Sequence, residues 1–262
     1  LTSVLDGPSE LVREGANANE ILIPKLSMQG LADYNKSTGY VAGDVTLDYE
    51  TKKCAYDRGR MFNVDAMDNI ESAGIAFGRL SGEFLRTQVV PELDAYRLAS
   101  YAQIPGVTTA KAALATGKEA LAALRTARGK IENAEANLST CYLFINPTVY
   151  GLIEDLDTTA SKKAIEGFAG IIKVPSGRFY DKVKLNASGA GGFTKDTGAV
   201  AMNFLIVDKQ AAIQYQKHTV SKVIFPDQNQ TADGWKFGYR TVGIAECKDN
   251  KKDGIYVHTV AE

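Results

Sequence analysis

The first part of the chain alternates hydrophobic and polar residues. Val45 to Glu50 follow this alternation strictly, and a second set shares one parity: Tyr56, Arg58, Arg60, Phe62 and Val64. A period of two residues is typical of β-strands. The pattern between Leu26 and Asp65 therefore predicts a long hairpin or ribbon.

Charged side chains occupy the faces of this predicted ribbon: Lys36, Asp48, Lys52, Lys53, Asp57 and Arg58. An isolated two-stranded ribbon is marginally stable in water, and this one is too polar to enter a core. An arm of about 15 residues reaches about 50 Å, at roughly 3.3 Å per residue. We therefore expect the ribbon to lie on another surface, and a neighbouring subunit can provide one.

Helical periodicity follows in two segments. Asp68 and Glu71 predict the start of a long helix that continues to Gln103 and is kinked at Pro91. Thr116 and Glu119 form a second capping box. Apolar residues then recur every three or four positions: Ala120, Leu124, Ala127, Ile131, Ala134 and Leu138. This spacing predicts an amphipathic helix with one buried face.

The rest of the chain predicts short strands and one more helix. Strands are expected at 141–146, 171–174, 199–207, 222–225, 238–245 and 254–260, with a helix after Pro147. A glycine-rich loop spans 188–198, and a polar turn spans 248–253. The predicted fold class is α+β.

Composition narrows the function classes. The 262 residues carry 30 Lys and Arg against 31 Asp and Glu, so the formal charge is −1. That balance gives no overall positive charge with which to bind nucleic acid or an anionic membrane surface. No stretch approaches the roughly 20 apolar residues of a membrane span. The first 24 residues are acidic and aperiodic, which predicts an extended arm. Three well-separated cysteines predict reduced thiols: Cys54, Cys141 and Cys247. The first 24 residues have no basic region followed by an apolar run, which together with the missing membrane span predicts a cytosolic product.

Candidate chemistry is sparse. His218 and His258 are the only histidines, and neither has a second ligand at metal-binding spacing. Asp196-Thr197-Gly198 is the aspartic-protease tripeptide, whose chemistry needs two carboxylates that share a proton. Thr194 and Lys195 precede it where a buried apolar strand is expected, so an exposed loop is favoured. We expect no catalytic, metal or cofactor site, and a hydrolase using Asp196 remains the alternative from another class.

Four strings resemble the major capsid proteins of tailed bacteriophages, which have the Hong Kong 97-like fold. RGRMFNVDAMD at 58–68 and FLRTQVVPELDAYRLA at 84–99 are similar to the passage from ribbon to spine helix in that family. YLFINPTVYGLIE at 142–154 is similar to the axial domain, and GIYVHTVA at 254–261 to the closing segment. The resemblance covers essentially the whole chain.

The resemblance implies a division of the chain. Residues 1–24 would form the N-terminal arm and 25–66 the extended loop, a β-ribbon. Residues 67–115 and 220–262 would form the peripheral domain with the spine helix, and 116–219 the axial domain. Some members of the family lose an N-terminal scaffolding segment to a maturation protease, which would fit a chain that starts at Leu1.

The function implied is assembly. Hexamers and pentamers would close an icosahedral shell around double-stranded DNA, without sequence-specific contacts or a membrane. The protein would be assembled in the bacterial cytoplasm and located in the virion, with portal and scaffolding protein or maturation protease as partners. Ribbon residues expected at subunit contacts are Lys36, Asp48, Glu50, Lys52, Lys53, Arg58 and Arg60. An encapsulin-type compartment, with the same fold around an enzyme, is the second alternative.

Overall fold

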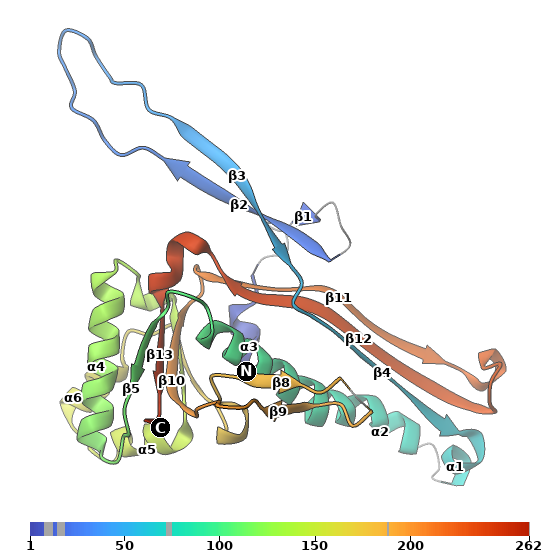
Figure 1. The fold of residues 1–262 in the computed structure, drawn as a ribbon. Helices are drawn as coiled ribbons and strands as arrows, with labels where there is room; N and C mark the ends of the chain where they lie inside the picture. Colours follow the sequence, from blue (N-terminus) through green and yellow to red (C-terminus); the bar gives the residue numbers. More distant parts are fainter. Residues whose placement is uncertain (8–12, 15–18, 72–74, 188, 262) are drawn as a thin grey trace.

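Figure 1 shows a body from which one pair of strands projects. The computed structural model describes residues 1–7, 13–14, 19–71, 75–187 and 189–261. The described part combines helices with four β-sheets, which confirms the predicted α+β class.

A five-stranded sheet lies in the body, in the order β5-β13-β10-β6-β7. Its strands are β5 (Thr108–Lys111), β6 (Cys141–Ile145), β7 (Gly170–Lys173), β10 (Met202–Asp208) and β13 (Ile255–Thr259). β10 runs antiparallel to β13 and β6, whereas the outer pairs are parallel. Every residue of β10 is buried, so both faces of the sheet are covered, as its continuous apolar run requires.

Three helices cover one face of this sheet: α4 (Gly117–Asn133), α5 (Pro147–Glu154) and α6 (Thr159–Ile165). The predicted capping box of Thr116 and Glu119 is present at the start of α4. The predicted apolar stripe from Ala120 to Ile131 is buried. The helix ends at Asn133, before the last two residues of the predicted stripe. Leu138 instead lies in a short 3₁₀ turn, from which it reaches the same core.

The predicted long helix borders the other face of the sheet, but it is not one regular helix. It consists of α1 (Ala66–Glu71), α2 (Ile75–Phe84), a π-helical segment (Leu85–Val89) and α3 (Val90–Ala102). Pro91 has no N–H for the helical ladder, and the widened turn directly precedes it. Proline and π-bulges are common causes of helix kinks. Both occur in this stretch, and the kink at Pro91 stays a prediction.

The N-terminal segment is only partly the arm that the sequence predicts. Thr2–Leu5 forms a short 3₁₀ helix, and Leu5 is fully buried beside Leu98 and Tyr101 of α3. These first residues therefore belong to the core. Residues 8–12 and 15–18 of the predicted arm lie outside the described residues.

A long three-stranded sheet contains β11 (Ala212–Ile224), β12 (Gly234–Cys247) and β4 (Tyr56–Asp65), in that order. β4 was predicted in the ribbon, but it pairs with β12 along its whole length. β12 and β13, the two C-terminal strands, lie in different sheets. The predicted boundaries at 115 and 219 thus cut across sheets: β13 pairs with β10, and β11 begins at Ala212.

The projecting ribbon, called the ribbon below, comprises β2 (Glu20–Met28), β3 (Val45–Lys53) and the connecting residues 29–44. β2 and β3 are antiparallel, with Leu26 opposite Leu47 and Met28 opposite Val45. The short strand β1 (Arg13–Glu14) pairs with the base of β2. Residues 20–24, assigned to the arm from sequence, are therefore part of the ribbon.

The predicted glycine-rich loop, 188–198, is interrupted by a short strand. β8 (Val183–Leu185) and β9 (Phe193–Lys195) form an antiparallel pair, and the chain continues from β9 to β10. Both strands contact α3. The loop that joins them is thereby held beside the long helix.

Candidate functional site

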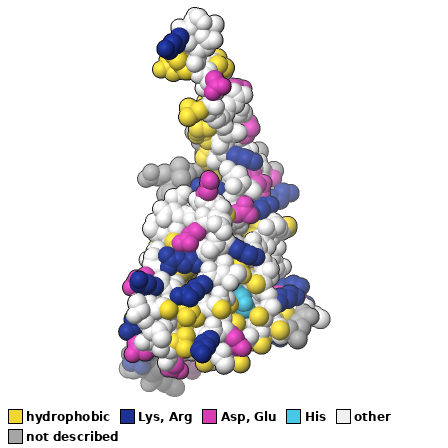
Figure 2. Space-filling model, turned by 90° about the vertical axis from the view of Figure 1, so that its left-hand side faces the viewer, with side chains coloured by type: hydrophobic (Ala, Val, Ile, Leu, Met, Phe, Trp, Pro, Cys, Tyr) yellow, Lys and Arg dark blue, Asp and Glu magenta, His cyan; other side chains and the backbone are white. Residues whose placement is uncertain are grey.

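The ribbon exposes apolar side chains that a monomer leaves in water. The exposed fractions of Leu26, Met28, Val45 and Leu47 lie between 51% and 64%. Figure 2 shows hydrophobic side chains along the ribbon and at its tip. At the tip the rings of Tyr34 and Tyr40 meet edge to face, with centroids 5.0 Å apart. Exposed apolar groups gathered in this way commonly mark a contact with another molecule.

The base of the ribbon is anchored to the body. Ile21 and Ile23 are buried against Ile213 of β11 and Ile244 of β12. The next residues of β2, from Lys25 onward, are exposed. Only the base of the ribbon is therefore fixed, and its outer part extends beyond the body (Figure 1).

Lys52 adds an ionic anchor at the same place. Its Nζ lies 2.7 Å from Glu50, 3.3 Å from Glu246 and 3.6 Å from Asp249. Burial alone would lower the pKa of Lys52, but hydrogen bonds to Glu50 and Glu246 raise it above its usual value. This ammonium group therefore stays charged and ties β3 to β12 within one chain.

The structure separates the residues that the sequence assigns to subunit contacts. Lys36, Asp48 and Lys53 are exposed on the ribbon. Glu50 and Lys52 form the anchor just described, whereas Arg58 and Arg60 lie on β4 in the long sheet. The last two residues are thus not on the ribbon, because the alternating pattern alone could not reveal which strand pairs with which.

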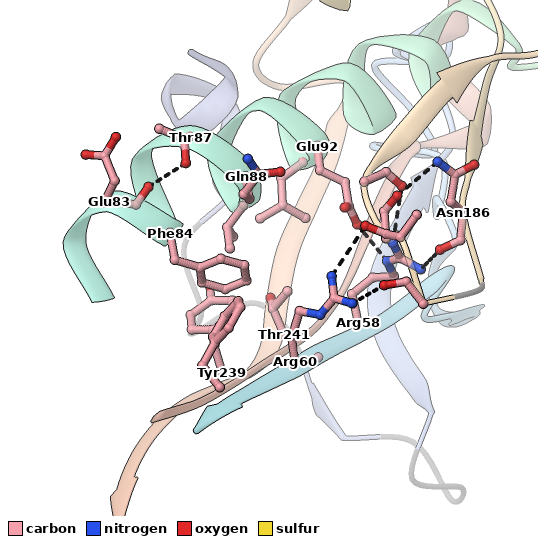
Figure 3. A pocket seen from close by; sticks show the side chains of 18 of the residues that line it. Arg58, Arg60, Glu83, Phe84, Thr87, Gln88, Glu92, Asn186, Tyr239 and Thr241 are labelled. Atoms are coloured by element: carbon pink, nitrogen blue, oxygen red, sulfur yellow. Dashed lines mark hydrogen bonds and ion pairs between the residues drawn. The ribbon is translucent and has the colours of Figure 1, made fainter. Parts of the chain in front are cut away.

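A cavity of about 690 Å³ lies between β4, the π-helical segment and the β8–β9 loop. Figure 3 shows Arg58 beside Glu92 and Asn186 at one end of it. Arg58 Nε donates to Glu92 at 2.6 Å, and its Nη atoms donate to the carbonyl oxygens of Asn186 at 2.8 Å and Gly192 at 3.3 Å. One guanidinium therefore joins the long sheet, the long helix and the β8–β9 loop.

Arg60 and several rings complete the cavity. Arg60 donates to the carbonyl oxygens of Gly189 and Ala190. The ring of Phe84 contacts Phe62 at 4.8 Å and faces Tyr239 at 6.3 Å between centroids (Figure 3). These contacts hold the cavity walls together within one chain. Arg60 itself is exposed, and the subunit contacts expected of both arginines stay predictions.

Asp94 has a structural role that the sequence does not reveal. Its carboxylate is buried and accepts hydrogen bonds from Thr2 N at 2.9 Å and Thr2 Oγ1 at 2.8 Å. The buried Arg97 donates to the same hydroxyl at 3.2 Å. No local pattern indicates a contact across 92 residues.

The candidate chemical groups lie apart from one another. Asp196 is exposed in a turn, where its carboxylate accepts a hydrogen bond from Thr197 N at 2.8 Å. This is unlike the buried shared-proton pair that the hydrolase alternative requires. Burial raises the pKa of Cys141 and Cys247 to about 12, which makes these thiols unreactive.

Within the described ranges, no group of three or more His, Cys, Asp or Glu side chains is placed to hold a metal ion. Among the described helices, none has the length and apolar character needed to cross a bilayer.

Comparison with known proteins gives matches at the level of structure. No protein-family model matches the sequence, and no curated protein sequence matches it either. A solved structure from Gordonia phage Cozz matches 100% of this chain and 87% of its own, at 12% identity and a TM-score of 0.63.

Two other matches are similar in extent. The capsid of cyanophage P-SCSP1u matches 95% of this chain and 86% of its own, at 13% identity and a TM-score of 0.61. A virus-like particle from Pyrococcus furiosus matches 89% and 86%, at 15% identity and a TM-score of 0.57. At these identities the likeness establishes the fold.

Proposed function

Because the chain has the fold of tailed-phage capsid proteins, the Hong Kong 97-like fold, we propose that it is a major capsid protein. Its work is to form pentamers and hexamers that close an icosahedral shell around double-stranded DNA. The match over 95% of the chain to a structure described as a capsid carries this proposal. The projecting ribbon supports it, since a strand pair with exposed apolar residues needs a neighbour.

The proposal assigns a task to each part of the chain. The five-stranded sheet with α4, α5 and α6 is the axial domain, which would surround the five- and six-fold axes. The long helix and the long sheet form the peripheral domain, and the ribbon is the extended loop. Lys36, Asp48 and Lys53 remain the candidates for ribbon contacts with a neighbour, because they are exposed there.

Partners follow from the same proposal. The main partner is a second copy of the chain, and portal and scaffolding protein or maturation protease would act during assembly in the bacterial cytoplasm. With a net charge of only −1, the chain has no global excess of cations to bind the DNA backbone, so the shell would enclose the DNA without sequence-specific contacts. The mature location would be the virion.

A compartment shell of the encapsulin type is the second candidate. The match to a virus-like particle from Pyrococcus furiosus favours it. Such a shell would hold a protein cargo bound by short peptides, whereas a phage head would hold DNA.

Electron microscopy and sedimentation of the purified protein test the proposal. We expect closed shells, or five- and six-fold rings, when the protein is expressed alone or with a scaffolding protein. A variant in which residues 30–43 of the ribbon are replaced by a short Gly-Ser turn should give rings or aggregates without closed shells. A monomer or dimer under all conditions would contradict the proposal, and nuclease-resistant DNA or bound cargo would separate the two candidates.

A further inference from the structure

A buried polar pair joins two central strands of the five-stranded sheet. His258 of β13 and Asn203 of β10 are only 3% and 5% exposed. The Nδ1 atom of His258 lies 3.0 Å from Nδ2 of Asn203, and the imidazole ring stacks on Phe204 with centroids 4.8 Å apart. Histidine is the side chain whose charge ordinarily changes between about pH 5 and 8. This pair is therefore a candidate for a contact that depends on pH.

The backbone of Ala112 fixes the orientation of the Asn203 amide. The same Nδ2 atom donates a hydrogen bond to the carbonyl oxygen of Ala112 at 3.1 Å. A carbonyl oxygen can only accept, so the amide nitrogen of Asn203, and not its oxygen, must face Ala112. His258 Nδ1 then accepts the second N–H of that amide and carries no proton. The geometry therefore requires neutral His258 with its proton on Nε2.

A proton on Nδ1 is incompatible with this arrangement. The Nδ1–H group would point at the NH₂ group of Asn203, and both groups are donors. If the amide turns over, its oxygen can accept from Nδ1–H, but that oxygen can no longer donate to Ala112. One of the two hydrogen bonds is therefore lost on protonation. Hydrogen bonds to a charged group are the stronger ones, so the bond to Ala112 is the one that breaks.

Ala112 begins the segment that joins β5 to α4. Its N–H donates to the backbone of β13 at 3.1 Å, and its carbonyl oxygen is held by Asn203. At the other end of the segment, the N–H groups of Ala115 and Thr116 donate to Glu119 at 2.9 and 3.0 Å. The Asn203 side chain thus ties residues 112–115 to β10 just before α4 begins.

The surroundings of the imidazole are apolar within the described residues. Ala110 of β5, Leu114 and Leu121 pack on the core that contains Phe204. Charged and titratable side chains on the neighbouring elements are Lys111 on the opposite face of β5, Asp208 at the far end of β10, Tyr256 on β13, Tyr150 and Glu154 on α5, and Lys118, Glu119, Arg125, Arg128, Lys130 and Glu132 on α4. Burial alone lowers the pKa of His258, which agrees with a ring that has no charged neighbour.

We propose that His258, Asn203 and Ala112 form a pH-operated latch that holds residues 112–115 on β10. The latch is closed while His258 is neutral. On acidification a proton from the solvent adds to Nδ1, the Asn203 amide turns its oxygen to the new N–H, and the segment before α4 is released. Only hydrogen bonds change in this step. The inference concerns the subunit itself and does not depend on the proposed assembly function.

Nitrogen-15 NMR of the imidazoles in the unassembled subunit tests the closed state without a variant. His218 and His258 are the two histidines of the chain, and His218→Asn assigns their signals. We expect His258 to carry its proton on Nε2 at neutral pH and to titrate below the ordinary pKa of about 6.5. A proton on Nδ1 at neutral pH, or titration at or above the ordinary value, would overturn the latch.

Hydrogen exchange followed by mass spectrometry tests the release. The N–H groups of Ala112, Ala115 and Thr116 are hydrogen-bonded in the closed latch, so their exchange reports its opening. Between the ordinary pKa of about 6.5 and the lowered pKa of His258, each pH unit should raise the open population about tenfold. After correction for the intrinsic pH dependence of exchange, we expect this slope for residues 112–116 but not for 120–131 of α4.

Glu119 is not the source of such a slope. Hydrogen bonds from Thr116 and Ala115 lower the pKa of the Glu119 carboxyl, so this group stays ionised above about pH 5.

His258→Asn removes the titration but keeps an acceptor, because its amide oxygen can take the place of Nδ1. This variant should abolish the slope at residues 112–116. The matched control His218→Asn should retain the slope, because His218 is exposed on β11. A wild-type protein without the slope, or equal slopes in His258→Asn and the wild type, would overturn the proposal. If His258→Asn does not fold, the NMR titration and the wild-type exchange still decide it.

Discussion

Replacing Arg58 by glutamine tests whether the cavity beside the long helix is held together within one subunit. The change removes the ion pair with Glu92 at 2.6 Å and the hydrogen bonds to Asn186 and Gly192. It leaves the Glu92 carboxylate, which is only 13% exposed, without its cation. Arg58 itself is 23% exposed.

The expected loss of stability follows from this geometry. A hydrogen bond to a charged group contributes about 1.5–3 kcal/mol, and breaking a fully buried ion pair costs about 3–5 kcal/mol. Because solvent partly screens the Arg58–Glu92 pair, we expect Arg58→Gln to lower the free energy of unfolding by about 2–3 kcal/mol.

Arg86→Gln is the matched control, because Arg86 forms an ion pair on the long helix that also carries Glu92. Arg86 pairs with Glu83, also at 2.6 Å, but the two side chains are 72% and 59% exposed. Exposed pairs contribute about 0–1 kcal/mol, so this variant should remain close to the wild type.

Urea denaturation of the unassembled subunit measures both variants, and hydrogen exchange reports on the β8–β9 loop. We expect faster exchange around Asn186 only in Arg58→Gln. Free energies of unfolding that agree within about 0.5 kcal/mol for the two variants would refute this reasoning. A loss of assembly without a loss of stability would restore Arg58 to the subunit contact expected from sequence.

Three further predictions concern the helices and the five-stranded sheet. Thr116→Ala should cost about 1 kcal/mol of unfolding free energy, because Thr116 caps α4 in a capping box with Glu119; an unchanged urea midpoint would count against it. Burial lowers the pKa of His258, so the unfolded state binds the proton more readily and stability should fall as the pH drops below about 6.5. His258→Gln should flatten this dependence of melting temperature on pH, and equal slopes would contradict the assignment. Pro91→Ala should change the unfolding free energy by less than about 1 kcal/mol but alter shell size or shape in electron micrographs; equal losses of soluble protein and shells would argue against it.

Much of the local structure could be predicted from the sequence. The capping box of Thr116 and Glu119 and the buried stripe of α4 are where the spacing places them, because a helix needs only local capping and a periodic apolar face. The strand that precedes Pro147 and the helix that follows it are confirmed for the same reason. The α+β class follows from such local patterns.

Pairing between distant segments could not be predicted. β4 alternates as a ribbon strand would, yet it pairs with β12, which is far away in the sequence. A strand pattern gives the side-chain period but not the partner. For that reason Arg58 and Arg60 were assigned to the ribbon, although they lie on β4 and line the cavity beside the long helix.

Local sequence patterns were enough to predict α4, the strand before Pro147 and the helix after it. They also showed that the ribbon carries charged residues that a core would not accept, but they missed α6 and the short strands β5, β8 and β9. The tertiary structure added that Leu26 and Met28 of β2 lie on the same face as Leu47 and Val45 of β3, because this depends on the register between the two strands. The tertiary structure also decided that Asp94 holds the N-terminal segment in place. Both results depend on contacts between residues distant in sequence, and local propensities do not encode such contacts.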